Sequence, residues 1–121
     1  MMHTILIVDD NERIRDLYGK NFSREGYRVL QASCADEANE ILLIEKVDLM
    51  LLDINMPSVD GAVFHLVTRM FHPDIKIIIS SVYPLDDQKS LIKGATDYFD
   101  KSESLRILVQ KVKAALVVNS I

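Results

Sequence analysis

The 121-residue chain, with 49% hydrophobic and 26% charged residues, has the length and composition of one compact domain rather than of a disordered or fibrous chain. Its formal net charge of -4 offers no basic surface to a nucleic-acid backbone, so direct nucleic-acid binding by this chain is not expected. Cys34 is the only cysteine, which excludes an internal disulfide and a multi-cysteine zinc site and favours a reducing compartment.

The first apolar run, Ile5–Val8, is rich in branched residues and is followed by two aspartates, so it predicts a short buried strand. Four residues are too few for a signal-peptide core or a membrane span, and we expect a cytoplasmic protein without membrane association. Asn11 is placed to cap the next helix, whose apolar residues, Tyr18 among them, recur at helical spacing. Gly26 then stands where a left-handed helix stop is expected.

A second strand is predicted over residues 27–32. Ser33, three residues before Asp36, has the spacing of a capped start for the second helix. A third strand is predicted at Val47 and residues 49–52. Its apolar residues are continuous rather than alternating, which is typical of a parallel strand covered by helices on both faces.

The third helix is predicted over Ala62–Phe71, with Asp60 as its cap. A fourth apolar strand follows at residues 75–79. The next helix, residues 84–93, has few apolar anchors, so we expect little to hold it in place. A weaker fifth strand is predicted over residues 95–99.

The last helix has the clearest helical pattern in the chain. Ser102 is predicted to cap it, and apolar residues from Leu105 to Leu116 form one stripe. Five alternations of strand and helix predict a doubly wound α/β fold, with a five-stranded parallel sheet of order 2-1-3-4-5 and helices on both faces. We expect this flavodoxin-like topology to form a single domain over residues 1–121.

Three aspartates stand at the predicted ends of the first and third strands: Asp9, Asp10 and Asp53. In a sheet of this order, the two strand ends flank the point where strand order reverses, which is where ligands bind. Carboxylates gathered there repel one another unless a hard divalent cation joins them, and Mg²⁺ accepts carboxylate, water and phosphate oxygens. We therefore predict Mg²⁺ as the cofactor. The alternative is that these aspartates serve only as turn and cap residues.

Four segments carry the signature positions of a known family, namely I-L-I-V-D-D at 5–10, L-L-D-I-N-M-P-S-V-D-G at 51–61, I-I-I-S-S at 77–81 and G-A-T-D-Y-F-D-K at 94–101. Each segment alone is weak as a motif, but their order and their predicted strands make the combination specific. Together they resemble the receiver domain of bacterial two-component response regulators. The resemblance extends over nearly the whole chain.

The resemblance implies that Asp53 is the phospho-acceptor. It also implies that Asp53 binds Mg²⁺ together with Asp9, Asp10 and the backbone carbonyl of Asn55. The chemistry is compatible with these roles, because a carboxylate can act as a nucleophile toward phosphorus when the charge on the transferred group is neutralised.

The same resemblance gives Ser80 a hydrogen bond to the phosphoryl group, Lys101 an ion pair with it, and Tyr98 a change of rotamer on switching. Lys suits this role as a compact and flexible point charge. Each residue also has an ordinary structural interpretation. Lys101 would then be a solvated surface lysine, Ser80 a strand cap and Tyr98 a half-buried packing residue.

The chain departs from the family pattern after Lys101. The family usually has a proline there, after a cis peptide bond, whereas this chain has Ser102. A cis bond before a non-proline residue costs about 3–4 kcal/mol, so we expect a trans bond or a strained loop. The segment from Ser80 to Lys101 is also one residue shorter than is common and has Pro84 near its start. We therefore predict an altered fourth helix.

The resemblance implies a signalling protein rather than an enzyme. A histidine kinase or phosphotransfer protein would donate a phosphoryl group to Asp53, in two-component phosphorelay signal transduction. Contacts of the phosphoryl group with Ser80 and Lys101 would then shift an equilibrium in the face formed by the fourth helix, fifth strand and fifth helix. The implied receivers of the signal are a downstream effector or a covalently attached output domain, and this face is a candidate homodimer interface.

Two other functions remain open from the sequence. One is a receiver-like interaction module that works without phosphorylation. The other is an FMN carrier of the same topology, although the acidic segment 9–13 stands where a phosphate-binding loop rich in Ser, Thr and Gly is expected. Three scattered histidines lack a second ligand at useful spacing, and we expect each of them at the surface or its boundary: His3, His65 and His72.

Overall fold

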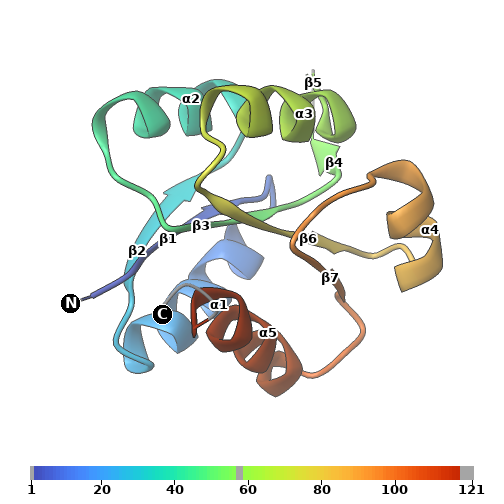
Figure 1. The fold of residues 1–121 in the computed structure, drawn as a ribbon. Coiled ribbons are helices and arrows are strands. Elements are labelled where there is room, and N and C mark those ends of the chain that lie inside the picture. Colours follow the sequence, from blue (N-terminus) through green and yellow to red (C-terminus); the bar gives the residue numbers. More distant parts are fainter. Residues whose placement is uncertain (1, 57–58, 118–121) are drawn as a thin grey trace.

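The computed structural model of the protein describes residues 2–56 and 59–117. A five-stranded parallel sheet runs through its centre in the order β2-β1-β3-β6-β7 (Figure 1). β6 and β7 are the fourth and fifth strands of this sheet, so the predicted order 2-1-3-4-5 is confirmed. The strands are β1 (Thr4–Val8), β2 (Arg28–Ala32), β3 (Leu49–Leu52), β6 (Lys76–Ser81) and β7 (Asp97–Asp100).

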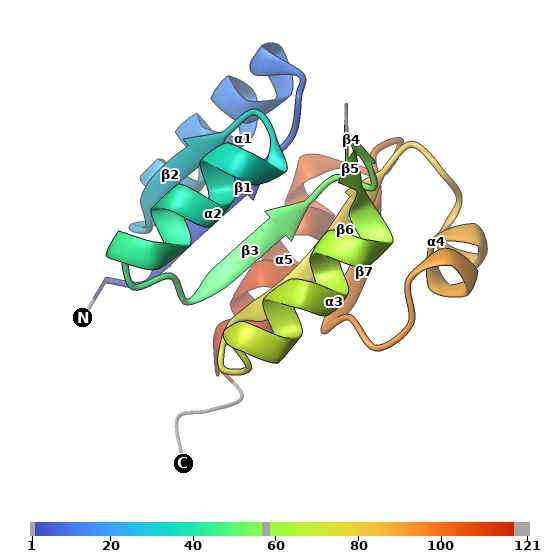
Figure 2. The same ribbon diagram turned by 90° about the horizontal axis from the view of Figure 1, so that it is seen from above.

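Helices cover both faces of the sheet, as predicted. The helices are α1 (Glu12–Arg24), α2 (Ala35–Ile44), α3 (Gly61–Phe71), α4 (Leu85–Leu91) and α5 (Leu105–Val117). α1 and α5 pack on one face and α2 and α3 on the other, while α4 lies beside the β7 edge, apart from α3 (Figure 2). None of these helices, within the described part of the chain, has the length and apolar character needed to cross a membrane.

Two buried clusters form the core, one on each face of the sheet. Ile5 and Ile7 of β1 pack toward α1 and α5, whereas Leu6 and Val8 pack toward α2 and α3. This alternation follows from the two-residue period of a strand. Burying a large aliphatic side chain stabilises a protein by about 1.5–3 kcal/mol, so an apolar strand contributes to the core from both faces.

Three of the predicted helix boundaries are confirmed. Asn11 Oδ1 accepts a hydrogen bond from the N–H of Ile14 at 3.2 Å, and Asp60 Oδ1 accepts one from the N–H of Ala62 at 2.8 Å. Each side chain satisfies an N–H at a helix start that has no partner inside the helix. Gly26 has φ 94°, the left-handed conformation that glycine adopts without strain.

The two predicted serine caps were wrong. α2 begins after Cys34, and Ser33 instead donates from its N–H to Glu37 Oε1 at 2.7 Å. Ser102 lies in a turn before α5, where its N–H and its hydroxyl both donate to Asp100 Oδ1 at 2.8 Å. In both cases a nearby carboxylate accepts the hydrogen bonds that the serine donates. Sequence spacing alone does not reveal such a competing acceptor. The Lys101–Ser102 peptide bond is trans.

Two details of the fold differ from the predicted elements. A small antiparallel hairpin, β4 (Asn55–Met56) with β5 (Val59–Asp60), follows β3, and Pro57 of the family motif lies outside the described residues. The fourth helix is only seven residues long, against the ten residues predicted. The hairpin lies past the carboxyl end of β3, whereas α4 follows β6 and lies beside the β7 edge (Figure 2).

Candidate functional site

Four polar side chains emerge together at the carboxyl ends of the sheet strands. Asp9, Asp53 and Lys101 directly follow β1, β3 and β7, and Ser80 lies near the end of β6. We call these four the site side chains. Each of these four residues lies two positions after a residue that is buried in the core beneath α1 and α5. Because successive side chains of a strand point to opposite faces of the sheet, all four site side chains point toward that same face. The preceding core residues are Ile7, Leu51, Phe99 and Ile78, respectively.

Backbone hydrogen bonds extend the sheet ladder to the residues that follow the strands. The N–H of Asp9 donates to Ala32 O at 3.1 Å, and the N–H of Asp53 donates to Val8 O at 3.0 Å. The N–H of Lys101 donates to Ser81 O at 2.8 Å. The site is therefore held by the sheet itself rather than by mobile loops.

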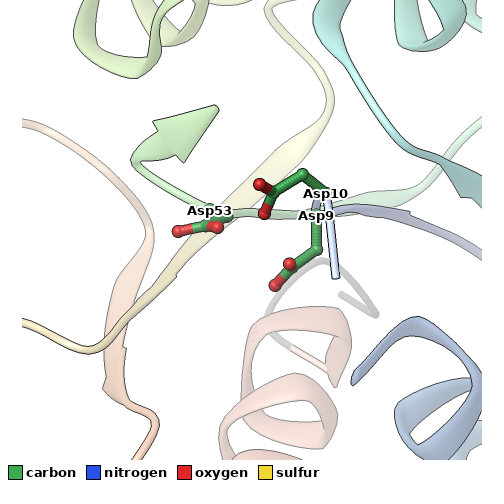
Figure 3. A group of neighbouring side chains, drawn as sticks. All are labelled: Asp9, Asp10 and Asp53. Carbon is green, nitrogen blue, oxygen red and sulfur yellow. The ribbon is translucent and has the colours of Figure 1, made fainter. Parts of the chain in front are cut away.

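The three predicted carboxylates converge. Asp9, Asp10 and Asp53 each offer an oxygen, and these oxygens lie within 4.8 Å of one another (Figure 3). Asp9 and Asp53 are buried, whereas Asp10 is exposed. One oxygen of each buried carboxylate is already fixed, since Asn11 N–H donates to Asp9 Oδ1 at 2.9 Å and Asn55 N–H to Asp53 Oδ1 at 3.1 Å.

Lys101 lies between the two buried carboxylates. Its Nζ is 2.7 Å from Asp9 Oδ2 and 3.5 Å from Asp53 Oδ2. Burial alone lowers the pKa of the Lys101 ammonium, but the hydrogen bond to Asp9 and the two carboxylate charges outweigh burial and raise it. Lys101 therefore stays charged, and it is not the solvated surface lysine of the alternative interpretation.

The carboxyl group of Asp53 is strongly perturbed. Burial raises its pKa to about 6, and the Asp9 charge adds to the rise. The Lys101 ammonium and the Asn55 N–H oppose the rise by favouring the charged form. The cluster is thus short of positive charge, and a divalent cation is the species that would supply it.

The donor set fits Mg²⁺. It contains only hard oxygen ligands, with two buried carboxylates and one exposed carboxylate that leaves the cluster open to solvent. Asn55 directly follows Ile54, two residues after Asp53, and its N–H already bonds that aspartate. This hydrogen bond holds the backbone of Asn55 next to the cluster, as a carbonyl ligand requires.

Tyr98 faces the opposite side of the sheet from the site side chains. It packs against the core beneath α2 and α3, and its hydroxyl donates to Ile92 O at 2.6 Å and accepts from Ala95 N–H at 3.3 Å. Its backbone carbonyl accepts a hydrogen bond from Lys111 of α5. Tyr98 therefore connects the segment after α4 with β7 and α5.

Three further residues near the site were not predicted to be part of it. Arg15 Nη1 donates to Asp9 O at 2.7 Å, and the Tyr83 hydroxyl lies 3.5 Å from Asn55 Oδ1. Tyr18 is buried, and burial raises the pKa of its hydroxyl while the nearby Lys101 ammonium lowers it, although the sequence indicated only an apolar helix position. His65 was expected at the surface or its boundary, but it is buried on α3.

This fold and this site together define a class of protein, a doubly wound α/β domain with a cluster of acidic side chains and a partly buried lysine at its switch point. The profile of the response regulator receiver domain family matches residues 5–113. The chain therefore belongs to the response regulator receiver domain family, as the motifs indicated.

Several relatives match this chain over almost their whole length. Sporulation initiation phosphotransferase F of Bacillus subtilis (strain 168) is 34% identical over 122 residues, which cover 99% of this chain and 98% of that protein. Response regulator protein TrrA of Thermotoga maritima, solved in complex with Mg(2+)-BeF, superposes with a TM-score of 0.87 at 33% identity, covering 95% of this chain and 100% of that one. A CheY-like receiver domain protein of Methanospirillum hungatei JF-1 superposes with a TM-score of 0.89 at 30% identity, covering 96% and 94%.

Proposed function

We propose that this protein accepts a phosphoryl group on the carboxylate of Asp53 from a phosphohistidine of a histidine kinase or phosphotransfer protein. The observation that carries the proposal is the convergence of three carboxylates at the strand ends, two of which form ion pairs with the partly buried Lys101 ammonium. Packing of the apolar core would not bring three carboxylates together. A role as a turn or cap residue would explain each aspartate by itself, but not why the three converge.

The proposed reaction is a direct displacement at phosphorus. An Asp53 carboxylate oxygen forms a bond to phosphorus while the bond between phosphorus and the histidine nitrogen breaks, and that nitrogen keeps the electron pair. Lys101 would contact the transferred oxygens from its position 3.5 Å from Asp53 Oδ2. Ser80, whose Oγ has no hydrogen-bond partner among the described residues, would donate to one of them.

Asp9, Asp10, Asp53 and the backbone carbonyl of Asn55 are the proposed ligands for Mg²⁺. When bound, this ion neutralises negative charge on the transferred group and on the cluster. The solved relative with Mg(2+)-BeF, at 33% identity, supports the assignment. Because the pKa of Asp53 is raised to about 6, the ion would also favour the carboxylate form that attacks.

The proposed output is a shift of the face formed by α4, β7 and α5. New contacts of the phosphoryl group with Ser80 and Lys101 would move the ends of β6 and β7, and Tyr98 would change its rotamer in response. Tyr98 is suited to this role because its hydroxyl bonds the Ile92 carbonyl just after α4. A downstream effector, an attached output domain or a second copy would recognise the changed face, in the cytoplasm.

A relative suggests a second outcome for the phosphoryl group. The Bacillus subtilis protein, 34% identical over 98% of its length, is named a phosphotransferase. We propose onward transfer from Asp53 to a histidine of another protein as an alternative output. It needs the same acceptor site but no change in the α4, β7 and α5 face.

Incubation with acetyl phosphate and Mg²⁺, followed by intact mass measurement, tests the proposed acceptor. We expect the mass gain of one phosphoryl group in the wild-type protein, and no gain after Asp53→Asn or when EDTA replaces Mg²⁺. Asp36→Asn, which changes an exposed aspartate on α2, is the matched control and should be modified like the wild type. A folded wild-type protein that gains no mass would instead favour the phosphorylation-independent interaction module.

A further inference from the structure

The helix α3 carries apolar side chains on its solvent side as well as on its core side. Phe64 is buried in the core cluster beneath α2 and α3. Val63, Leu66 and Met70 recur at helical spacing on the outer side of the helix, and each of them is more than half exposed. A helix that is apolar on two opposite sides needs a neighbour on each of them. The described residues of this chain leave the outer side of α3 open.

The end of α2 extends this exposed apolar surface. Leu43 and Ile44 are the last two residues of α2, and both are exposed to about the same high degree. α2 and α3 lie over the same face of the sheet, and Leu43 and Phe71 line one hollow of about 320 Å³ (Figure 2). We call six residues of these two helices the α2–α3 patch, namely Leu43, Ile44, Val63, Leu66, Met70 and Phe71.

The α2–α3 patch has the size of a protein interface. The exposed fractions of its residues run from 54% for Val63 to 82% for Ile44, and they amount together to on the order of 700–800 Å². The largest apolar patch on a typical monomer is about 300–600 Å². Each partner in a standard interface buries about 800 Å². Two copies of this patch in contact would therefore bury the area that a stable dimer needs.

The shape of the patch suits a two-fold pairing. A two-fold interface uses the same surface on both copies, so that surface has to supply both the projecting side chains and the hollow that receives them. Leu66 and Met70 are exposed on α3, and the hollow between α2 and α3 lies beside them. The patch is thus able to receive an apolar side chain from a second copy and to offer one to it.

The charges around the patch favour a second copy whose helices run in the opposite direction. α2 and α3 run in the same direction, because each of them connects two strands of a parallel sheet. Asp36 and Glu37 lie in the first turn of α2, whereas Arg69 lies in the last turn of α3 and Lys46 follows α2. A two-fold axis perpendicular to the helices would place the acidic end of each copy opposite the basic end of the other.

We propose that two copies of this chain associate through the α2–α3 patch as a two-fold dimer. The inference goes beyond phosphorylation of Asp53 and does not depend on it. The patch covers the face of the sheet opposite the one toward which the site side chains point. Asp53 therefore stays open to a phosphoryl donor, and the face formed by α4, β7 and α5 stays free for an output partner.

The first test measures the mass of the wild-type protein in solution, in EDTA and without a phosphoryl donor. Sedimentation at protein concentrations from about 1 to about 100 μM covers the affinities of weak standard-size interfaces. We expect twice the chain mass of 13.8 kDa, with a dissociation constant of about 10 μM or lower. A monomer at the highest concentration would overturn the proposal, and so would species larger than a dimer, because a two-fold pairing is closed.

Met70→Lys and Phe71→Lys test whether this patch forms the dimer. Each change places a charge in both halves of the interface, and we expect the dissociation constant to rise at least about tenfold. Leu91→Lys is the matched control, because it makes the same kind of change at an exposed apolar residue of α4. We expect this control to dimerise like the wild type. A dimer that survives both patch substitutions, or one that Leu91→Lys breaks, would overturn the proposal.

A second measurement needs no substitution. Isotope-filtered NMR of a mixture of labelled and unlabelled wild-type protein detects contacts between copies only. We expect such contacts at the methyl groups of Leu66 and Met70. Contacts confined to Leu91 or to α5 would overturn the proposal, since they would place the interface on the face formed by α4, β7 and α5. A dimer of this kind that is never phosphorylated would refute the proposed function and leave this inference standing.

Discussion

The Lys101 ammonium forms its shorter ion pair with Asp9, at 2.7 Å between Nζ and Oδ2, rather than with the proposed acceptor Asp53. Asp9 is also a proposed Mg²⁺ ligand, so one carboxylate serves both cations. Two cations that share a carboxylate repel each other and compete for its charge. Lys101 is therefore expected to weaken Mg²⁺ binding while it prepares the site for a phosphoryl group.

Replacing Lys101 with alanine tests this competition. Without the ammonium, Asp9 and Asp53 lose the ion pairs that they form with Lys101, and we expect Mg²⁺ to bind about three- to tenfold more tightly. Titration calorimetry of the wild-type protein, Lys101→Ala and the exposed control Lys89→Ala measures the change. Equal or weaker Mg²⁺ binding in Lys101→Ala would contradict the competition.

The raised pKa of Asp53, about 6 against an ordinary value of 3.8, predicts how stability depends on pH in metal-free protein. The folded state holds the Asp53 proton more tightly than the unfolded chain, so stability falls as pH rises from about 4 to about 6 and then stays constant. Asp53→Asn removes this penalty. We expect it to stabilise the protein at pH 7.5 by about 1–3 kcal/mol, and by less at pH 4.5.

Urea unfolding in EDTA at the two pH values measures this effect. Mg²⁺ should stabilise the wild-type protein at pH 7.5 and should have a smaller effect on the variant, because the ion binds the carboxylate that was replaced. The exposed Asp36→Asn should change stability by less than about 0.5 kcal/mol at either pH. If Asp53→Asn increased the free energy of unfolding equally at both pH values, titration of the Asp53 carboxyl group would not be the cause of the increase.

The order of the strands and the convergence of the site followed from the sequence because both depend on local patterns. Continuous apolar runs predict parallel strands, and residues just past such strands meet at one edge of the sheet. The burial of Tyr18 in the core next to Ile7 and Phe99 was not assigned to the site because its ring satisfies the helical apolar pattern, while its neighbours depend on packing against distant strands. The burial of Gln88 and the short length of α4 could not be predicted from the sequence for the same reason, because both depend on tertiary hydrogen bonds.

Gln88 anchors α4 to the sheet. Its side chain is fully buried, and its Nε2 donates to Tyr83 O at 2.8 Å and to Phe99 O at 2.9 Å. Gln88→Ala leaves these carbonyls without that donor, and we expect a loss of about 2–3 kcal/mol in the free energy of unfolding. Amide exchange across residues 85–91 should accelerate in parallel. Lys89→Ala, an exposed change in the same helix, should have little effect on either measurement.

Tyr98→Phe distinguishes two roles of Tyr98: its contribution to stability through the segment after α4, and its proposed role in switching. Losing the 2.6 Å hydrogen bond to Ile92 O should cost about 1 kcal/mol in urea unfolding. Acetyl phosphate and Mg²⁺ should change amide exchange in residues 85–97 of the wild-type protein, and we expect a smaller change in Tyr98→Phe. Phosphorylation of Asp53 itself should still occur. An identical exchange response in both proteins would assign Tyr98 to packing alone.

Gly61 fixes the loop that carries Asp53 and Asn55. A Cβ atom at this position would lie 2.5 Å from Ile54 O and 2.8 Å from Ile54 Cα, and backbone atoms cannot move aside as a flexible side chain can. We expect Gly61→Ala to destabilise the protein by about 2–4 kcal/mol and to slow phosphorylation by displacing Ile54 next to Asp53.

Gly19→Ala is the matched control, because it makes the same substitution inside α1 with ordinary contacts of 3.4 Å or more. Alanine is favoured over glycine in a helix interior, so this change should stabilise the protein by about 0.5–1 kcal/mol. Urea unfolding of both variants, together with their phosphorylation rates, distinguishes a steric clash at Gly61 from a general effect of adding a methyl group. Opposite signs of the two stability changes are required, and two changes of the same sign would contradict the close approach of Ile54.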